Sequence, residues 1–98
     1  MAIKSISVFT IQPGRRDEFV DLFESLVGQH MPIVRSAGCS AVTLYRVVDD
    51  ADKAVEIADW ESADARDAAQ TNEEWGVFAP LFELVAAPPS ATLVEPLH

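Results

Sequence analysis

The most informative stretch of this 98-residue sequence is residues 40–62, SAVTLYRVVDDADKAVEIADWES. Residues 40–48 and 54–60 are rich in Val, Ile, Thr and aromatic side chains, which favour strands. The polar segment between them, residues 49–53, is short enough to connect two antiparallel strands. Ser62, which follows the second run, can cap the start of a helix. This stretch therefore predicts a β-hairpin followed by a short helix.

The segment upstream of the hairpin predicts a strand and a long helical region. Residues 3–11 have the composition of a strand, and apolar residues recur at helical spacing from Arg15 onwards. The apolar face of this helix comprises Phe19, Leu22, Phe23, Leu26, Val27, Ile33 and Val34. Because proline lacks a backbone donor and clashes with the preceding turn, Pro32 is expected to kink or split the helix. Gly38 is placed to cap its end.

The segment downstream of the hairpin predicts a further helix and a closing strand. Thr71 and Glu74 form a capping-box pattern, which opens a helix that Pro88 and Pro89 stop. Residues 91–95 read as a last strand. The resulting order is βαββαβ, which is the ferredoxin-like arrangement of the α+β class, with helices on one side of an antiparallel sheet. The length corresponds to one domain.

Both faces of the predicted sheet carry apolar side chains. Along the first strand Ile6 and Val8 alternate with Ile3, Phe9 and Ile11, and along the third strand Val55 and Ile57 alternate with Ala58 and Trp60. Two helical segments can cover only one face, and an antiparallel sheet open to water would alternate apolar with polar residues. We therefore expect a homodimer packed through the sheet faces. The alternative is a monomer whose strands are assigned out of register.

Composition and motifs exclude several classes of function. The net charge is −9, from 16 acidic and 7 basic side chains, so nucleic acid and anionic membrane surfaces would be repelled. With Cys39 as the only cysteine and no signal peptide or long apolar run, the sequence predicts a cytoplasmic protein. His30 and His98 are far apart, and no Gly-x-Gly-x-x-Gly or His-Glu-x-x-His motif is present. We expect no metal and no flavin or nicotinamide cofactor.

The aromatic residues are the first candidates for a binding site. Trp60 ends the third strand beside a helix start, where its ring could pack while its N–H reaches a ligand. Trp75 and Phe78 on the last helix could complete a pocket for a flat aromatic molecule. The alternative is core packing, which is the favoured interpretation for Phe19, Phe23 and Phe82.

His30 is the candidate base. If the first helix continues past Gln29, His30 falls in the middle of its apolar face, where burial would lower the pKa of the imidazole and suit it to accept a proton near neutral pH. The alternative is a core histidine whose N–H groups are satisfied by backbone carbonyls.

Several short motifs, in this order along the chain, resemble the antibiotic biosynthesis monooxygenase family. They are Pro13-Gly14-Arg15 with Phe19, then Arg35-Ser36-Ala37-Gly38-Cys39, Tyr45, Trp60-Glu61-Ser62 and Pro88-Pro89. The resemblance implies a dimeric α/β barrel of two ferredoxin-like units joined through their sheets. It also implies cofactor-free oxidation by O2 of a small aromatic substrate, either an anthrone-type polyketide or a quinol. Trp60 matches the pocket tryptophan of the family.

The sequence departs from the family pattern at two positions. Polyketide-oxidising relatives tend to have Asn four residues before the tryptophan and Tyr six residues after it, where this chain has Glu56 and Arg66. A haem-ligating histidine about ten residues past the tryptophan is absent, so haem degradation is not expected. We therefore predict His30 and Trp60 as catalytic residues. The predicted substrate-binding residues are Trp75, Phe78, Phe23 and Tyr45. The alternatives are an isomerase or cyclase of the same fold, or a non-catalytic dimer that binds a small molecule.

Overall fold

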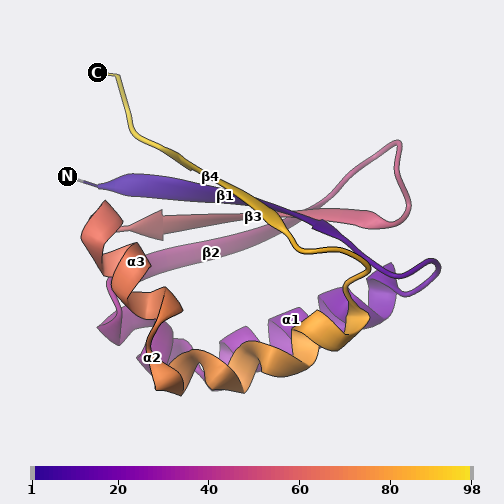
Figure 1. Ribbon diagram of the computed structural model, residues 1–98, viewed down its shortest axis with the longest axis horizontal. Coiled ribbons are helices and arrows are strands. Elements are labelled where there is room, and N and C mark those ends of the chain that lie inside the picture. The colour runs from indigo at the N-terminus through magenta and orange to yellow at the C-terminus, as the bar shows by residue number, and fades with distance from the viewer. Residues whose placement is uncertain (1, 98) are drawn as a thin grey trace.

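The computed structural model describes residues 2–97, which follow the order βαββαβ (Figure 1). The elements are β1 (Ile3–Thr10), α1 (Arg16–Gln29), α2 (Met31–Ser36), β2 (Cys39–Arg46), β3 (Lys53–Trp60), α3 (Ala63–Gln70), the 3-10 helix η1 (Glu73–Leu84) and β4 (Ser90–Val94). The strands are antiparallel and lie in the order β2-β3-β1-β4. This arrangement confirms the predicted α+β ferredoxin-like fold.

The helices all lie against one face of the sheet (Figure 1). Because side chains alternate along a strand, this face receives Ser5 and Phe9 from β1 and Ala58 and Trp60 from β3, all of which are buried. The buried residues form two clusters, one around Phe9, Ile11, Phe19, Phe23, Ala54, Leu81 and Leu84, the other around Ile3, Val34, Cys39, Ala58, Trp60 and Ala69. Trp75 and Phe78 are partly buried residues packed on these clusters, so η1 bridges the two halves of the core.

The first helical region is split, as predicted. Residue His30 lies between α1 and α2, with φ of −116° and ψ of 21°, outside the helical range. Pro32 lies in the first turn of α2. Backbone N–H groups in a first turn have no acceptor within the helix, so the missing N–H of proline costs no hydrogen bond there. Gly38 follows α2 with φ of +93°, a left-handed conformation that glycine adopts without strain, and this confirms its predicted role as a cap.

The last helical segment begins one residue later than predicted. Asn72, and not Thr71, is the N-cap, because its Oδ1 accepts a hydrogen bond from the backbone N–H of Glu74 at 2.9 Å. The Thr71 hydroxyl instead donates to the carbonyl of Ala68 at the end of α3. The predicted cap of α3 is confirmed, since Ser62 Oγ accepts from the N–H of Ala65 at 3.1 Å.

The geometry of η1 also differs from the α-helix that the spacing of apolar residues favoured. Pro80 lies inside the segment and has no backbone N–H, which interrupts regular α-helical bonding. A 3-10 helix has three residues per turn, so Trp75, Phe78 and Leu81 share one face, which packs toward the sheet. Phe82 falls off this face and is 54% exposed, so its assignment to the core was wrong.

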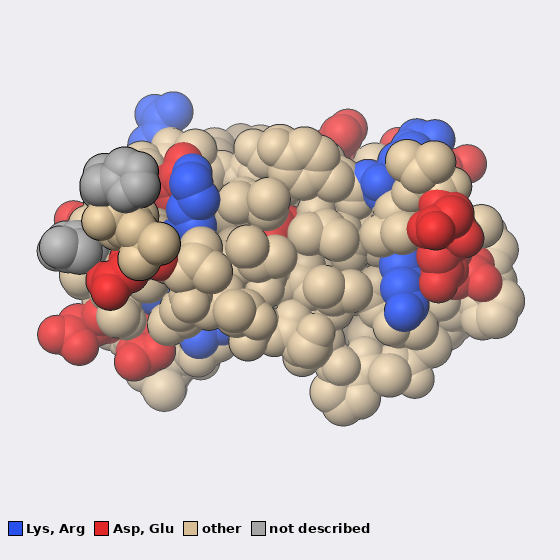
Figure 2. Space-filling view, turned by 90° about the horizontal axis from the view of Figure 1, so that it is seen from above, with Lys and Arg blue, Asp and Glu red and all other residues tan. Residues whose placement is uncertain are grey.

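The opposite face of the sheet carries Ile6, Val8, Val55 and Ile57, and it confirms the predicted alternation of two apolar faces. Tyr45 pairs with Val55 and therefore lies on the same face, half exposed. Figure 2 views this face and shows mostly uncharged side chains across its middle, with charged ones toward the two ends. The homodimer expected from this face stays a prediction. No helix within residues 2–97 combines the length and the apolar character needed to cross a membrane.

Candidate functional site

A cavity of about 400 Å³ lies between the sheet and the helices. The strands supply a partly polar floor that includes Ser5, Ser7 and Glu56, while α1 and η1 supply mainly apolar and aromatic side chains. The remaining wall comes from α3, through Arg66, Ala69 and Gln70. The cavity therefore has an aromatic side suited to a flat ring and a polar side that can make hydrogen bonds.

The aromatic side is built from the two tryptophans and Phe78. The rings of Trp60 and Trp75 stack with centroids 5.7 Å apart and an interplanar angle of 29°. The rings of Trp75 and Phe78 lie 5.3 Å apart at 55°. The three-residue period of η1 brings Trp75 and Phe78 to the same side of the helix, directly over the end of β3. These rings hold one another in place and form a wall for an aromatic ligand.

The two indole N–H groups differ in their hydrogen bonds. Trp60 is 6% exposed, and its Nε1–H donates to Ser5 Oγ at 3.0 Å. The interpretation that this N–H is free to reach a ligand is therefore wrong, because a buried neighbour on β1 already accepts it. Trp75 Nε1 is also buried, yet no acceptor for it lies within residues 2–97. Since a buried donor without a partner is unfavourable, Trp75 is the indole that could bind an oxygen atom of a ligand.

Glu56 and Arg66 place opposite charges at the polar side of the cavity. Glu56 lies on β3 directly opposite Ser7 of β1, on the face that also carries Ala58 and Trp60. Burial raises the pKa of the Glu56 carboxyl, and the positive charge of Arg66 partly opposes this by lowering it. The two side chains do not form an ion pair within 4.0 Å in the described part of the chain. A carboxyl whose pKa is raised toward neutral pH is better suited to exchange protons there than one with the ordinary pKa of a glutamate.

The structure brings some of the predicted site residues together and separates others. Trp60, Trp75, Phe78 and Phe23 all line the cavity, and their roles in binding or catalysis stay predictions. Tyr45 does not line it, because strand alternation places its side chain on the opposite face of the sheet.

His30 is also outside the cavity lining. Its ring meets the edge of Phe78 at a centroid distance of 6.1 Å. The helical projection that placed His30 among apolar residues does not hold, because α1 ends one residue earlier, at Gln29.

The sequence analysis noted Glu56 and Arg66 as departures from the family pattern and did not select them as site residues. One signal could have found Glu56, since it is a charged residue on the strand face shared with Ala58 and Trp60, where apolar residues are expected. Arg66 shares a helix face with Ala69 and Gln70, three and four residues later.

Cys39 lines the cavity but is unsuited to act as a nucleophile. Its side chain is 1% exposed, and burial raises the pKa of the thiol to about 11, which leaves it protonated near neutral pH. Within residues 2–97, His, Cys, Asp and Glu side chains do not gather in threes that could hold a metal ion.

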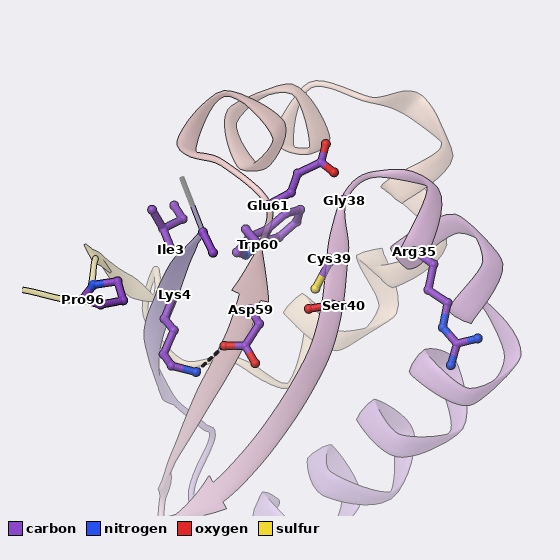
Figure 3. A pocket seen from close by; sticks show the side chains of 11 residues that line it. Ile3, Lys4, Arg35, Gly38, Cys39, Ser40, Asp59, Trp60, Glu61 and Pro96 are labelled. Carbon is purple, nitrogen blue, oxygen red and sulfur yellow. Dashed lines mark hydrogen bonds and ion pairs between the residues drawn. The ribbon is translucent and has the colours of Figure 1, made fainter. Parts of the chain in front are cut away.

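A second, open cleft of about 830 Å³ lies at the end of the sheet where β1 starts and β3 ends. Figure 3 shows the Lys4–Asp59 ion pair on one side of it and Glu61 reaching over Gly38 on the other, while the Arg35 side chain points away. Trp60 and Cys39 line both hollows and so form the wall between them. Because this cleft is more open to solvent than the cavity between sheet and helices, that cavity is the better site for chemistry that excludes water.

Comparisons with known proteins agree with this geometry. The family model described as antibiotic biosynthesis monooxygenase matches residues 2–81. A Bordetella bronchiseptica protein, described as a candidate antibiotic biosynthesis monooxygenase, is 27% identical and superposes with a TM-score of 0.79 over 99% of this chain and 98% of its own. SnoaB, a cofactor-independent oxygenase from Streptomyces nogalater, is 21% identical with a TM-score of 0.76 over 99% of this chain and 94% of its own. A search of curated proteins gives no match.

Proposed function

Because the chain belongs to the antibiotic biosynthesis monooxygenase family, we propose that it is a cofactor-independent monooxygenase. Its substrate would be a small aromatic molecule, either an anthrone-type polyketide or a quinol, oxidised by O2 in the 400 Å³ cavity. The observation that carries the proposal is the combination of a stacked aromatic wall with one partly buried carboxyl, Glu56, whose pKa is raised. Binding a flat ring, removing a proton and excluding water are the tasks that this chemistry requires.

Glu56 is the proposed proton acceptor, in the place that sequence reasoning gave to His30. It lines the cavity, whereas His30 does not. A base is most effective when its pKa lies near the working pH, and burial moves the pKa of Glu56 in that direction from the ordinary value of a glutamate. Arg66, the neighbouring cation, would stabilise negative charge that develops on the substrate.

The reaction needs no group beyond the substrate, O2 and these side chains. The ring methylene of an anthrone loses a proton to Glu56, and the resulting anion transfers one electron to O2. The two radicals combine to a peroxide anion, which regains the proton from Glu56. Loss of water then leaves a carbonyl, so that CH2 and O2 become C=O and H2O. The stacked indoles of Trp60 and Trp75 would orient the ring and limit access of bulk water.

Oxygen uptake by metal-free and flavin-free protein, with an anthrone or a hydroquinone, tests this function. We expect turnover that survives dialysis against a chelator and falls by 10²-fold or more in Glu56→Gln, as for loss of a general base. His30→Gln is the matched comparison, because its imidazole lies outside the cavity lining. Activity that disappears with the chelator contradicts the cofactor-free mechanism. A loss in His30→Gln with an unchanged Glu56→Gln returns the role of base to His30.

An isomerase or cyclase that uses the same cavity is the second candidate. The feature that favours it is again Glu56, because a carboxyl that accepts a proton can return it to another carbon of the same substrate without O2. Turnover that is unchanged under strict anaerobiosis would favour this reaction over the oxygenase.

The functional unit is proposed to be a homodimer joined through the open faces of the two sheets. The support is the run of apolar residues on this face, including Ile6, Val8, Val55 and Ile57, together with the mostly uncharged middle of the surface in Figure 2. A second copy covers such a face with an identical one, which is the commonest form of oligomer. Sedimentation of the wild-type chain tests this, and a stable single subunit at micromolar concentration would contradict it.

A further inference from the structure

Arg66 is the only lysine or arginine among the residues that line the cavity within residues 2–97. Its side chain is only 16% exposed, and the acidic group nearest to it is Asp67, with 3.9 Å between Arg66 Nη1 and Asp67 Oδ1. This distance is too long for a hydrogen bond, and the Asp67 side chain is 67% exposed, so the contact contributes little. The guanidinium therefore has most of its five N–H donors available.

A second donor without a partner in the described part of the chain belongs to Trp75, whose side chain lines the same cavity. Trp75 Nε1–H is buried and has no acceptor within residues 2–97, although its ring is held firmly between Trp60 and Phe78. The two donors differ in kind, since one is a cation with a planar fork and the other a single neutral N–H. Together they require a ligand with several acceptor oxygens beside an aromatic ring.

We propose that the cavity selects aromatic substrates that carry a carboxylate group, which Arg66 binds as a charged pair. The indole N–H of Trp75 supplies a donor for another oxygen of the same molecule. The planar guanidinium matches a carboxylate through two parallel hydrogen bonds, which a neutral hydroxyl or amide cannot form. This inference rests on the proposed function, because it names the substrate class of the same cavity.

The position of Glu56 makes carboxylate binding depend on pH. The charge of Arg66 lowers the pKa of Glu56, so a bound carboxylate that offsets this charge raises that pKa again. By linkage, the carboxylate must bind more weakly once Glu56 has lost its proton. Within residues 2–97, the other titratable side chain that lines the cavity is Cys39 on β2, which stays neutral. There α1 and η1 contribute only apolar and aromatic side chains, and β1 contributes serines and Phe9.

Binding of 2-naphthoate and of its neutral analogue 2-naphthamide, followed by tryptophan fluorescence, tests the proposal. We expect the wild-type protein to bind the acid about 10- to 100-fold more tightly than the amide, as for a charge-assisted pair. Arg66→Gln should abolish this preference, and Arg66→Lys should keep part of it. Arg35→Gln is the control, because it removes the same charge from outside the cavity lining and should leave the preference intact.

Equal binding of the two probes by the wild-type protein overturns the proposal, and so does a preference that survives in Arg66→Gln. If Arg66→Gln does not fold, the pH profile decides. Affinity for the acid should fall as pH rises from the ordinary pKa of a glutamate, and Glu56→Gln should remove this fall; a flat wild-type profile overturns the proposal.

Absence of oxygen uptake with both acidic and neutral anthrones refutes the oxygenase and leaves the naphthoate preference untouched. Oxygen uptake without that preference refutes only the carboxylate selectivity.

Discussion

The two faces of the sheet depart from the usual distribution of side chains. An antiparallel sheet with one covered face normally places apolar residues under the helices and polar ones outside. Here the covered face includes Ser5 and Glu56 among buried aromatic rings, whereas the open face carries Ile6, Val55 and Ile57. A partly buried carboxyl without an ion pair destabilises a fold, and apolar side chains that stay in water contribute no hydrophobic stabilisation. The covered face therefore has the features of a reaction site and the open face those of an interface.

The largest effect on stability is expected from Trp60→Ala on the covered face. Trp60 is 6% exposed and stacks on Trp75, so its removal should lower the free energy of unfolding by about 3–5 kcal/mol. Denaturant unfolding measures this, and Trp60→Phe, which keeps a ring, is the control with a smaller loss. A cost below about 1 kcal/mol would mean that the ring is a loose cavity wall and not part of the core.

On the open face, Ile57→Asp should break the proposed dimer. A charge without a partner in a sheet-to-sheet interface should cost about 3 kcal/mol, which weakens dimerisation by roughly 100-fold. Sedimentation velocity over a range of concentrations measures the change. Val48→Asp adds the same charge where the side chain is 98% exposed and should leave the dimer intact. If the two variants sediment identically, the open face is not the dimer interface.

A smaller loss is expected from Ser5→Ala, which leaves the buried Nε1–H of Trp60 without its acceptor. The cost should be about 2 kcal/mol, because an unsatisfied buried donor keeps its full desolvation penalty. Ser7→Ala, also in the cavity floor, is the control and should cost less. In a double-mutant cycle the effects of Ser5→Ala and Trp60→Phe should not add, since each removes the same hydrogen bond. Additive effects would show that the bond contributes nothing measurable.

The smallest effect, and the only gain, is expected from Glu56→Gln. A glutamate whose pKa is raised in the folded state stabilises the protein least when it is ionised, so wild-type stability should fall as pH rises from the unfolded value through the folded pKa. Glu56→Gln should lack this fall and gain on the order of 1 kcal/mol or less at neutral pH. Below the ordinary pKa of glutamate the two proteins should converge. Thermal unfolding over a pH series measures the difference. A wild-type protein that gains stability as pH rises above the ordinary pKa of glutamate would contradict a raised pKa of Glu56.

The elements of the fold could be predicted because their signals are local. Pro32 and Gly38 mark the division and the end of the first helical region through backbone restrictions that hold in any context. The last helix was predicted less well. A spacing of three residues between Trp75 and Phe78 fits both an α-helix and a 3-10 helix. The two geometries differ at Phe82, whose side chain an α-helix would have buried, whereas in η1 it is exposed.

The candidate site was predicted in its aromatic part and missed in its charged part. Trp60, Trp75 and Phe78 were expected together because large rings near the helix–sheet boundary tend to converge. His30 was selected from a helical projection that fails after one residue, at the end of α1. Glu56 was treated only as a departure from the family pattern, although its strand position turns it toward the helices.

Taken alone, the amino-acid sequence determined the order of strands and helices, the two apolar sheet faces and the likeness to a family of oxygenases. These properties depend on side-chain period and on turn and cap residues, which act over a few positions of the chain. Only the tertiary structure decided that Glu56 and Arg66 meet in one cavity, that Ser5 accepts the N–H of Trp60 and that Trp75 has no acceptor. Each depends on how helices distant in the chain pack on the sheet, because burial and partners, and not residue type, set the pKa and the hydrogen bonds of a side chain.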